Sequence, residues 1–288
     1  MSRSERPPLD RSDGQHDRRR DGRRFGSPSR GRDAIDGSAA VARTLARRVL
    51  PPTVVFAGLL AAWQGAVVYY DLPSVILPSP VEVGTALVDA SPMLLRDAAV
   101  TGATAGIGLA VGCVVGAALA FAMIHSRTAT NTILPVVVAL RIAPLVAIAP
   151  LLFLWFGRGV PARALVVATL TVFPITVATL DGLRKTPRSH LELLETVGAS
   201  KTAAFVHVRV PAAAPSVFAG LKIAATLSVV GAIVAEFVTL TAGIGYRVFE
   251  TAAYLRTAET YAALVVLSLL GIGFYLVPVA IERIVWNP

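Results

Sequence analysis

The fold is decided by residues 98–123, which read AAVTGATAGIGLAVGCVVGAALAFAM and contain no charged side chain. A helix needs about 20 predominantly apolar residues to cross the hydrocarbon core of a bilayer. This stretch meets that requirement, so we predict a membrane-spanning helix. Gly108, Gly112 and Gly116 recur every four residues and form a smooth stripe on one helix face. We expect the stripe to pack against another helix of the same chain; a contact between two chains is the alternative.

Five further segments have the length and hydropathy of membrane spans. They lie near residues 50–70, 133–155, 162–181, 214–240 and 259–282. The composition agrees, because only 16% of the residues are charged, whereas about a quarter are charged in soluble domains. The sequence therefore predicts an all-α membrane protein with six transmembrane helices. The third segment contains several prolines, which kink helices, so we expect it to pack inside the bundle or to line a cavity.

Positive charge is concentrated at the N-terminus. The formal net charge is +9, and the first 48 residues contain thirteen arginines and no lysine. Residues 1–47 have almost no large apolar side chains, so we predict a disordered tail. A basic tail favours the cytoplasmic side, and six spans return the C-terminus to the same side, so we expect both termini to be cytoplasmic. We interpret the tail as a solvated segment that orients the protein; contact with RNA or anionic lipid is the alternative.

The sequence offers no catalytic chemistry of its own. Its single cysteine, Cys113, lies in an apolar run, and its four histidines do not cluster at the spacing of metal ligands. It contains no Gly-x-x-x-x-Gly-Lys-Ser/Thr phosphate loop. We therefore predict no catalytic, cofactor, metal or ATP site, and no nucleic-acid-binding domain.

The segment between the fourth and fifth spans, residues 182–213, is long and polar. Residues 189–197 have the pattern of an amphipathic helix. Gly198 is expected to break this helix, and Ala199 with Ser200 to cap a second short helix over about residues 200–206. A hairpin of this kind must pack on its own bundle or dock on a partner.

This segment resembles the EAA signature of ABC importer permeases. The signature places a Glu six residues before a Gly, followed at a fixed spacing by two aliphatic residues and a Pro. The matching residues in this chain are Glu192, Gly198, Val208, Val210 and Pro211. The two alanines that usually follow the Glu are replaced by leucines, which remain apolar.

Three other stretches narrow the resemblance to the nitrate, sulfonate, taurine and bicarbonate permease group. They are Leu77-Pro78-Ser79-Pro80 with a short amphipathic segment at 81–89, the stretch 141–157, and Gly243-Ile244-Gly245-Tyr246. The similarity covers about residues 50–284. It implies a division into a tail (1–47), a first span with a periplasmic segment (48–94), and a type I permease domain (95–284) that contains the EAA coupling loop 182–213.

The resemblance also implies partners. A transport subunit of this kind is not an enzyme: two permease chains, expected to be identical, pair in the inner (plasma) membrane. Each docks its coupling loop, with Glu192, Gly198, Ala199, Ser200, Val208 and Pro211, on a separate ATPase subunit that binds ATP and magnesium. A periplasmic or lipid-anchored binding protein delivers the solute. We expect a nitrate-, sulfonate- or taurine-like solute; a thiamine-precursor pyrimidine or another vitamin is one alternative, and an ion-coupled secondary transporter is another.

Charged side chains within spans mark candidate functional positions. Arg141 lies near the middle of segment 133–155, and Glu236 lies toward the outer end of segment 214–240. We expect these two side chains either to pair as a structural tie or to face the translocation pathway. Together with Pro144 they are the candidate pathway residues. An Arg141 side chain that faces the cavity would suit an anionic substrate.

Overall fold

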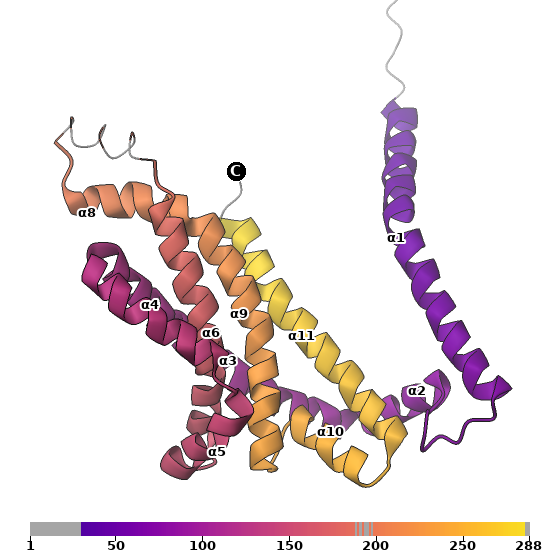
Figure 1. Cartoon of the computed structure of the whole chain (residues 1–288). Helices are drawn as coiled ribbons and strands as arrows, with labels where there is room; N and C mark the ends of the chain where they lie inside the picture. Colours follow the sequence, from indigo (N-terminus) through magenta and orange to yellow (C-terminus); the bar gives the residue numbers. More distant parts are fainter. Residues whose placement is uncertain (1–29, 188, 190–191, 193–195, 197, 286–288) are drawn as a thin grey trace, which may run out of the picture. The chain divides into compact units, whose positions relative to one another are not determined.

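The computed structural model describes residues 30–187, 189, 192, 196 and 198–285, and these residues form helices joined by short turns (Figure 1). The chain divides into two compact units, residues 1–58 and residues 59–288. No strand occurs among the described residues. The all-α prediction is therefore confirmed.

Helix α1 (Arg30–Tyr69) crosses the boundary between the two units. Its part from Leu50 to Tyr69 is long and apolar enough to span a membrane, which confirms the first predicted span. The helix also includes residues 30–47, for which the sequence predicts disorder. The difference has a local cause, because residues 38–46 are rich in alanine and also hold leucine and arginine, which favour helix. Residues 1–29 of the predicted tail lie outside the described residues.

The other helices all belong to the second unit. Helix α2 (Pro80–Asp89) begins with a capping box, in which the Ser79 hydroxyl accepts from the Glu82 amide and the Glu82 carboxylate accepts from the Ser79 amide. The helices in chain order are α2 (Pro80–Asp89), α3 (Ser91–His125), α4 (Arg127–Ile142), α5 (Leu145–Phe156), α6 (Val160–Arg184), α8 (Lys201–Ala204), the π-helix η1 (Phe205–Arg209), α9 (Val210–Thr239), α10 (Ile244–Ala253) and α11 (Thr257–Val285).

The third predicted span, 133–155, is not one continuous helix. Helix α4 ends at Ile142, α5 begins at Leu145, and the two helices are bent by 102°. Pro144 explains the break, because the residue before a proline is driven out of the helical region, and Ala143 has φ −58° and ψ 133°. The described part of the chain therefore has five helices able to cross a membrane, or six if the bent pair counts as one span.

The centre of the second unit is the close packing of α3, α6 and α9. The predicted glycine stripe on α3 faces α6, which settles the alternatives in favour of packing within the chain. A Cβ atom added to a stripe glycine would lie 2.3 Å from Val167 Cβ at Gly108, 1.9 Å from Thr171 Oγ1 at Gly112, and 2.9 Å from Ile175 Cβ at Gly116. Only glycine lets the two helices approach this closely.

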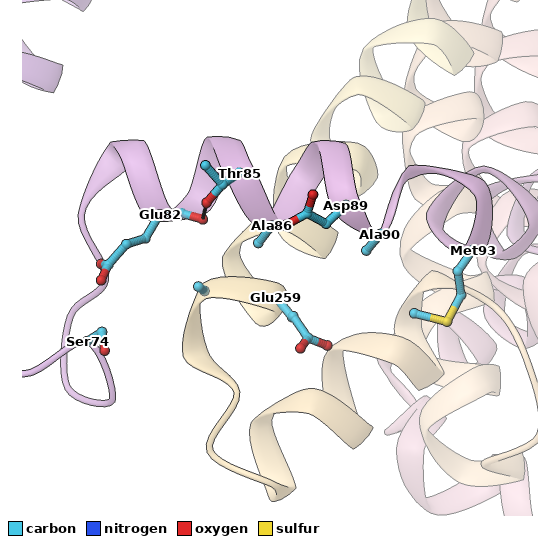
Figure 2. Close-up of a pocket in the computed structure, with 9 residues that line it drawn as sticks. Ser74, Glu82, Thr85, Ala86, Asp89, Ala90, Met93 and Glu259 are labelled. Carbon is cyan, nitrogen blue, oxygen red and sulfur yellow. Dashed lines mark hydrogen bonds between the residues drawn. The ribbon is translucent and has the colours of Figure 1, made fainter.

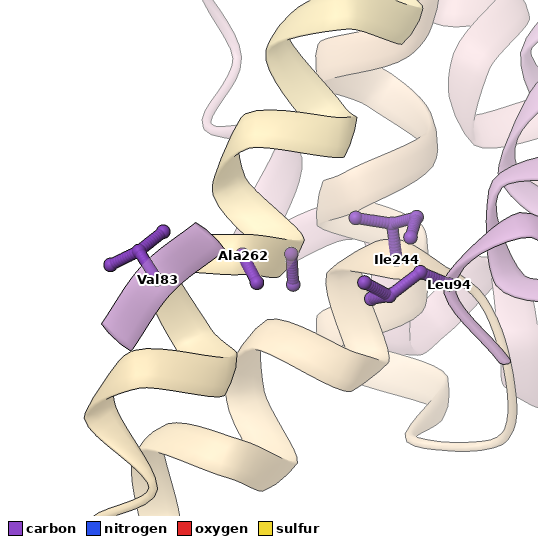
Figure 3. Packing of buried hydrophobic residues seen from close by; sticks show 5 residues of the cluster. Val83, Leu94, Ile244 and Ala262 are labelled. Atoms are coloured by element: carbon purple, nitrogen blue, oxygen red, sulfur yellow. The ribbon is translucent and has the colours of Figure 1, made fainter. Parts of the chain in front are cut away.

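The second unit has two ends that matter for function (Figure 1). At the α8 end, α3 and α6 finish and α4 and α8 begin; at the α10 end, α3 and α6 begin and α9 finishes. A cluster of buried apolar residues closes the α10 end (Figure 3). Its members, from α2, α3, α10 and α11, are Val83, Leu94, Ile244, Ala262 and Ala263.

Large apolar side chains cover much of the outside of the second unit. On α11 only 6% of the spanning window is buried, and Leu269, Ile272 and Val277 are more than half exposed. Such continuous apolar surface is unstable against water and is stable against lipid or another helix. The exposed surface therefore agrees with a protein that is integral to the membrane.

The glycine stripe leads to a matched pair of substitutions on α3. We expect Gly108→Ala to lower the melting temperature of the purified protein, because its methyl group would overlap Val167 and the Ala164 carbonyl oxygen. Gly106→Ala should be neutral or stabilising by up to about 1 kcal/mol, because nothing lies within 4 Å of that position and alanine favours helix. Thermal unfolding in detergent measures both; equal melting temperatures would contradict the close α3–α6 contact.

Candidate coupling segment and buried polar network

The segment that resembles the EAA signature lies at the α8 end. The structure describes residues 182–187, 189, 192, 196 and 198–213 of it, so most of the predicted helix 189–197 lies outside the described residues. Glu192 is exposed. Gly198 has φ +71°, and a Cβ atom added to it would meet nothing within 4 Å, so it adopts a left-handed conformation in open space. The predicted break at Gly198 is therefore present, and it needs glycine for its backbone angle.

Helix α8 follows this break. The Ser200 hydroxyl accepts a hydrogen bond from the Ala203 amide at 3.1 Å, which confirms the predicted cap, with Ala199 half-buried just before it. The prediction that this second helix ends near residue 206 is wrong. The helix continues through η1 into α9, and the Val210 amide donates to the Phe205 carbonyl five residues earlier.

Pro211 accounts for the π-helical turn. Its nitrogen carries no hydrogen, so the regular helical bond to the His207 carbonyl cannot form, and a π-turn absorbs the difference in register. Val208 and Pro211 are both half-buried. As a result, residues 201–239 form one helical run of 39 residues. Helix α8 is thus joined to α9 without a flexible loop.

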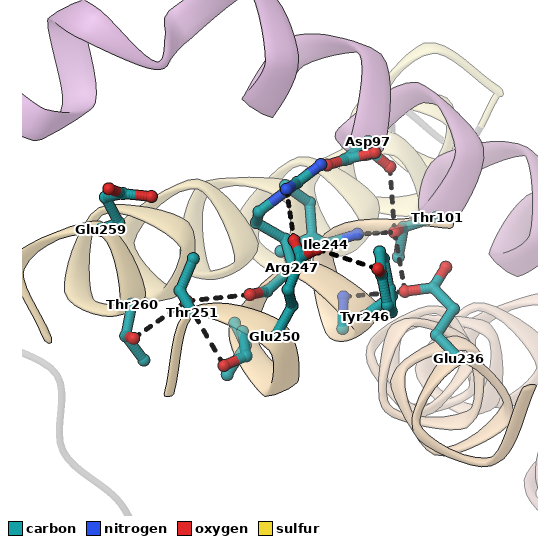
Figure 4. Close-up of polar contacts among 12 residues, drawn as sticks. Asp97, Thr101, Glu236, Ile244, Tyr246, Arg247, Glu250, Thr251, Glu259 and Thr260 are labelled. Atoms are coloured by element: carbon teal, nitrogen blue, oxygen red, sulfur yellow. Dashed lines mark hydrogen bonds and ion pairs between the residues drawn. The ribbon is translucent and has the colours of Figure 1, made fainter. Parts of the chain in front are cut away.

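The α10 end holds a buried polar network around Glu236, which is fully buried on α9 (Figure 4). One carboxylate oxygen, Oε2, accepts from the Gly245 amide at 2.8 Å and from the Thr101 hydroxyl at 3.1 Å. The Thr101 hydroxyl oxygen in turn accepts from the Ile244 amide at 2.9 Å. Glu236 and Thr101 therefore satisfy the first amides of α10, which have no partner within that helix.

Gly243 and Gly245 make room for this carboxylate. A Cβ atom at Gly243 would lie 2.2 Å from the Glu236 carboxyl carbon, and the residue has φ +109°. A Cβ atom at Gly245 would lie 2.9 Å from Oε2. The Gly-Ile-Gly stretch is thus the complement of Glu236. Glu236 stands out in the sequence as a charge within a span, and Gly243-Ile244-Gly245 stands out as a glycine-rich turn. The sequence does not show that the two are in contact.

Ionic contacts hold α10 against α3. Arg247 donates from Nε to Asp97 on α3 at 2.9 Å and also pairs with Glu250. The Tyr246 hydroxyl donates to Glu250 at 2.9 Å, and this carboxylate raises the pKa of Tyr246 above its usual value, so the phenol stays a neutral donor. Sequence reasoning missed this group, because Arg247 reads as an isolated loop charge when its partner is 150 positions away.

The structure does not bring Arg141 and Glu236 together. Arg141 is exposed in the last turn of α4, directly before the break at Pro144, which is also exposed. Glu236 is held by Thr101 and Gly245, and no ion pair among the described residues joins it to Arg141. Arg141 and Glu236 therefore do not form the predicted structural ion pair. A pathway role for Arg141, Pro144 and Glu236 stays a prediction.

A cleft of about 520 Å³ also opens at the α10 end, between α2 and the start of α11 (Figure 2). Glu82, Asp89 and Glu259 line it, together with Ser74 and Thr85. No basic side chain is among its described lining residues. The negative charge of these carboxylates would repel an anion, so this cleft is unsuited to hold one.

Long apolar helices, with a polar segment between two of them, define an integral membrane protein. The family described as "Binding-protein-dependent transport system inner membrane component" matches residues 108–285. The chain belongs to this family, and it is a type I ABC importer permease. The predicted family is thereby confirmed. Membership implies ATPase and substrate-binding partners.

Curated relatives support the same assignment. A probable ABC transporter permease of Haemophilus influenzae is 33% identical over 83% of this chain and 98% of its own length. The formylaminopyrimidine transport permease of Halalkalibacterium halodurans is 36% identical over 79% and 91%. A putative aliphatic sulfonates transport permease of Escherichia coli is 33% identical over 80% and 89%.

A solved structure shares the fold. A chain from an amino acid ABC transporter crystallised with histidines superposes with a TM-score of 0.57, at 16% identity, over 68% of this chain and 95% of that chain. At this identity the likeness concerns the fold alone. It agrees with the helical bundle of the second unit.

The network around Glu236 can be tested at Thr101. We expect Thr101→Val to destabilise the protein by about 1–3 kcal/mol, because the buried Ile244 amide loses its acceptor. Thr101→Ser keeps the hydroxyl and serves as the matched control. Chemical or thermal unfolding of both variants measures the difference. A Val variant as stable as the Ser variant would show that the hydroxyl does not hold α10.

Proposed function

We propose that this chain forms the translocation pathway of an ATP-driven importer in the inner (plasma) membrane. The segment 182–213 docks on a separate ATPase subunit, which binds ATP and magnesium. The observation that carries this proposal is the single helical run from Lys201 to Thr239, entered through the left-handed turn at Gly198. Because this run has no loop, a force applied to α8 moves α9 as one body.

The far end of α9 supports a mechanical role. Near that end Glu236 holds the first amides of α10, and Arg247 ties α10 to α3. A tilt of α9 therefore pulls directly on α10 and, through it, on α3. ATP binding and hydrolysis at one face of the membrane would in this way open and close the opposite face. The role of this chain is mechanical and it is not an enzyme.

Charge at the α8 end supports the proposed orientation. Arg184, Lys185, Lys201 and Arg209 lie where α6 finishes and α8 with η1 follows. Positive residues that flank spans favour the cytoplasmic side. The α8 end therefore faces the cytoplasm and the ATPase, both termini are cytoplasmic, and the α10 end faces the periplasmic or lipid-anchored binding protein.

The break between α4 and α5 supports a pathway that two copies of the chain line together. Non-helical backbone at membrane depth is stable where it is buried in protein or lines a watery cavity. Ala143 and Pro144 form such a break, and Arg141 beside them is exposed in the single chain. A homodimer would enclose both breaks and place two arginines along one pathway.

An anionic solute suits this pathway, and we favour a sulfonate-, nitrate- or taurine-like substrate. The guanidinium of Arg141 matches such anions in charge and in hydrogen-bond geometry. A formylaminopyrimidine-like vitamin precursor is the second candidate, because a relative with that transport name is 36% identical. An ion-coupled secondary transporter is set aside, since the chain belongs to the ABC permease family.

Gly198 provides the test of coupling. We expect Gly198→Asp and Gly198→Val to abolish ATP-driven uptake while the chain still inserts in the membrane, because a side chain at φ +71° strains the turn. Gly198→Asn is the control, since asparagine tolerates the left-handed region, and it should retain more uptake. Uptake in vesicles and co-purification of the ATPase subunit are the two measurements. Normal uptake by Gly198→Val would overturn the proposed coupling.

Arg141 provides the test of substrate charge. We expect Arg141→Ala to reduce uptake of an anionic solute at least about tenfold, with insertion unchanged, because an ion-paired hydrogen bond contributes about 1.5–3 kcal/mol. Arg158→Ala removes another exposed arginine, from the turn before α6, and serves as the control. Uptake of a labelled sulfonate and of a neutral pyrimidine should be compared in both variants. Unchanged sulfonate uptake by Arg141→Ala would exclude the pathway role.

A further inference from the structure

A second cavity, at the α8 end, has chemistry opposite to the acidic cleft. It has a volume of about 540 Å³ and lies between the α3–α4 turn, the end of α6 and η1. Three arginines line it, Arg127, Arg184 and Arg209, together with His125. No carboxylate is among its described lining residues. The coupling mechanism proposed above does not require this cavity.

A buried hydroxyl without a partner lies in the wall of the cavity. Thr186 is only 8% exposed, and its Oγ1 atom has no hydrogen-bond partner among the described residues. A buried hydroxyl without a partner costs free energy, so an occupant that accepts its hydrogen would stabilise the site. Three arginines line the same cavity, and their charge favours an anion as this occupant.

Other groups point to the same kind of occupant. Arg184 donates to the Thr130 hydroxyl at 3.3 Å, which holds the guanidinium at the cavity wall. Helix α4 begins here, capped by the Ser126 hydroxyl, which accepts from the Ala129 amide at 3.2 Å. Its first turn therefore adds the positive end of a helix dipole. Arginines, a hydroxyl and a helix N-terminus together suit a phosphate group.

The position of the cavity identifies the source of the phosphate. Helices α3 and α6 finish here, so the cavity lies where the apolar spans leave the hydrocarbon and meet the headgroups. Phe121, His125 and Phe205 form an aromatic cluster beside it, with the rings of Phe121 and Phe205 5.5 Å apart. Phe121 is 51% exposed and offers an apolar surface to an acyl chain.

We propose that this cavity binds the phosphate of an acidic phospholipid from the adjoining leaflet. The Thr186 hydroxyl donates to the phosphate, and Arg184 and Arg209 neutralise it. These two arginines lie near the two ends of the coupling segment, Arg184 in the last turn of α6 and Arg209 in η1. A bound headgroup therefore joins the two ends of that segment and braces it.

The test uses the intact transporter, with its ATPase subunits, in nanodiscs of phosphatidylglycerol and phosphatidylcholine in equal amounts. Native mass spectrometry then counts the lipids that remain bound. We expect selective retention of phosphatidylglycerol by the unmodified protein. Thr186→Val should weaken this retention about tenfold, the value for one hydrogen bond to a charged group. Arg184→Gln should weaken it about fivefold.

Arg96→Gln is the matched control, because it removes an exposed arginine from the other end of α3 and should leave retention unchanged. Thr186→Val removes a buried hydroxyl that has no partner among the described residues, so the melting temperature of the variant in lipid-free detergent should be at least that of the unmodified protein. The proposal would be overturned by equal retention of both lipids, by retention in Thr186→Val equal to that of the unmodified protein, or by displacement of phosphatidylglycerol by millimolar inorganic phosphate. Selective retention that appears only after the ATPase subunits are stripped would assign the cavity to the ATPase and also overturn it.

ATP-driven uptake is measured on the same preparations. Uptake that persists without selective lipid retention would reject only the lipid site. Loss of ATP coupling in the unmodified protein would instead reject the proposed function.

Discussion

The second unit is organised by the close approach of α3 and α6. Three glycines spaced four residues apart on α3 lack the side chains that would hold the two helices apart. Val167, Thr171 and Ile175 of α6 fill the space. In a bilayer there is little hydrophobic force between helices, so such tight van der Waals contact provides much of the association energy. Helix α6 packs in turn on α9. The position of α9, and of both functional ends, depends on this contact.

Helix α9 is attached to its neighbours in a different way at each end. At the α8 end it continues into η1 and α8, so that residues 201–239 form one helical element. At the α10 end Glu236 and Arg247 make hydrogen bonds and ion pairs that fix α10. A buried carboxylate costs a large desolvation free energy unless it is bonded, which makes the amides of α10 strong partners. These polar contacts attach α9 to α10, and Arg247 attaches α10 to Asp97 of α3.

Departures from helix occur where the backbone is forced to turn. Pro144 separates α4 from α5, Gly198 begins the turn into α8, and Gly243 begins the turn into α10. Two causes account for them: a clash of the proline ring with the preceding residue at Pro144, and a positive φ angle at the two glycines. Arginines line the cavity at the α8 end, whereas carboxylates line the cleft at the α10 end. This polarity agrees with two faces of a membrane that meet different partners.

The helical class, the spans near 50–70, 98–123, 162–181, 214–240 and 259–282, the glycine stripe, the cap at Ser200 and the break at Gly198 could all be predicted from the sequence. These features follow from hydropathy, spacing and backbone preference, which act over a few neighbouring residues. The three-dimensional packing was needed to show that the third span is bent by 102° and that α8 continues into α9. It was also needed to show that Glu236 binds the amides of α10 instead of Arg141, and that Asp97 pairs with Arg247. Those outcomes depend on which distant side chains packing brings within hydrogen-bond reach, and no local pattern in the chain contains that information.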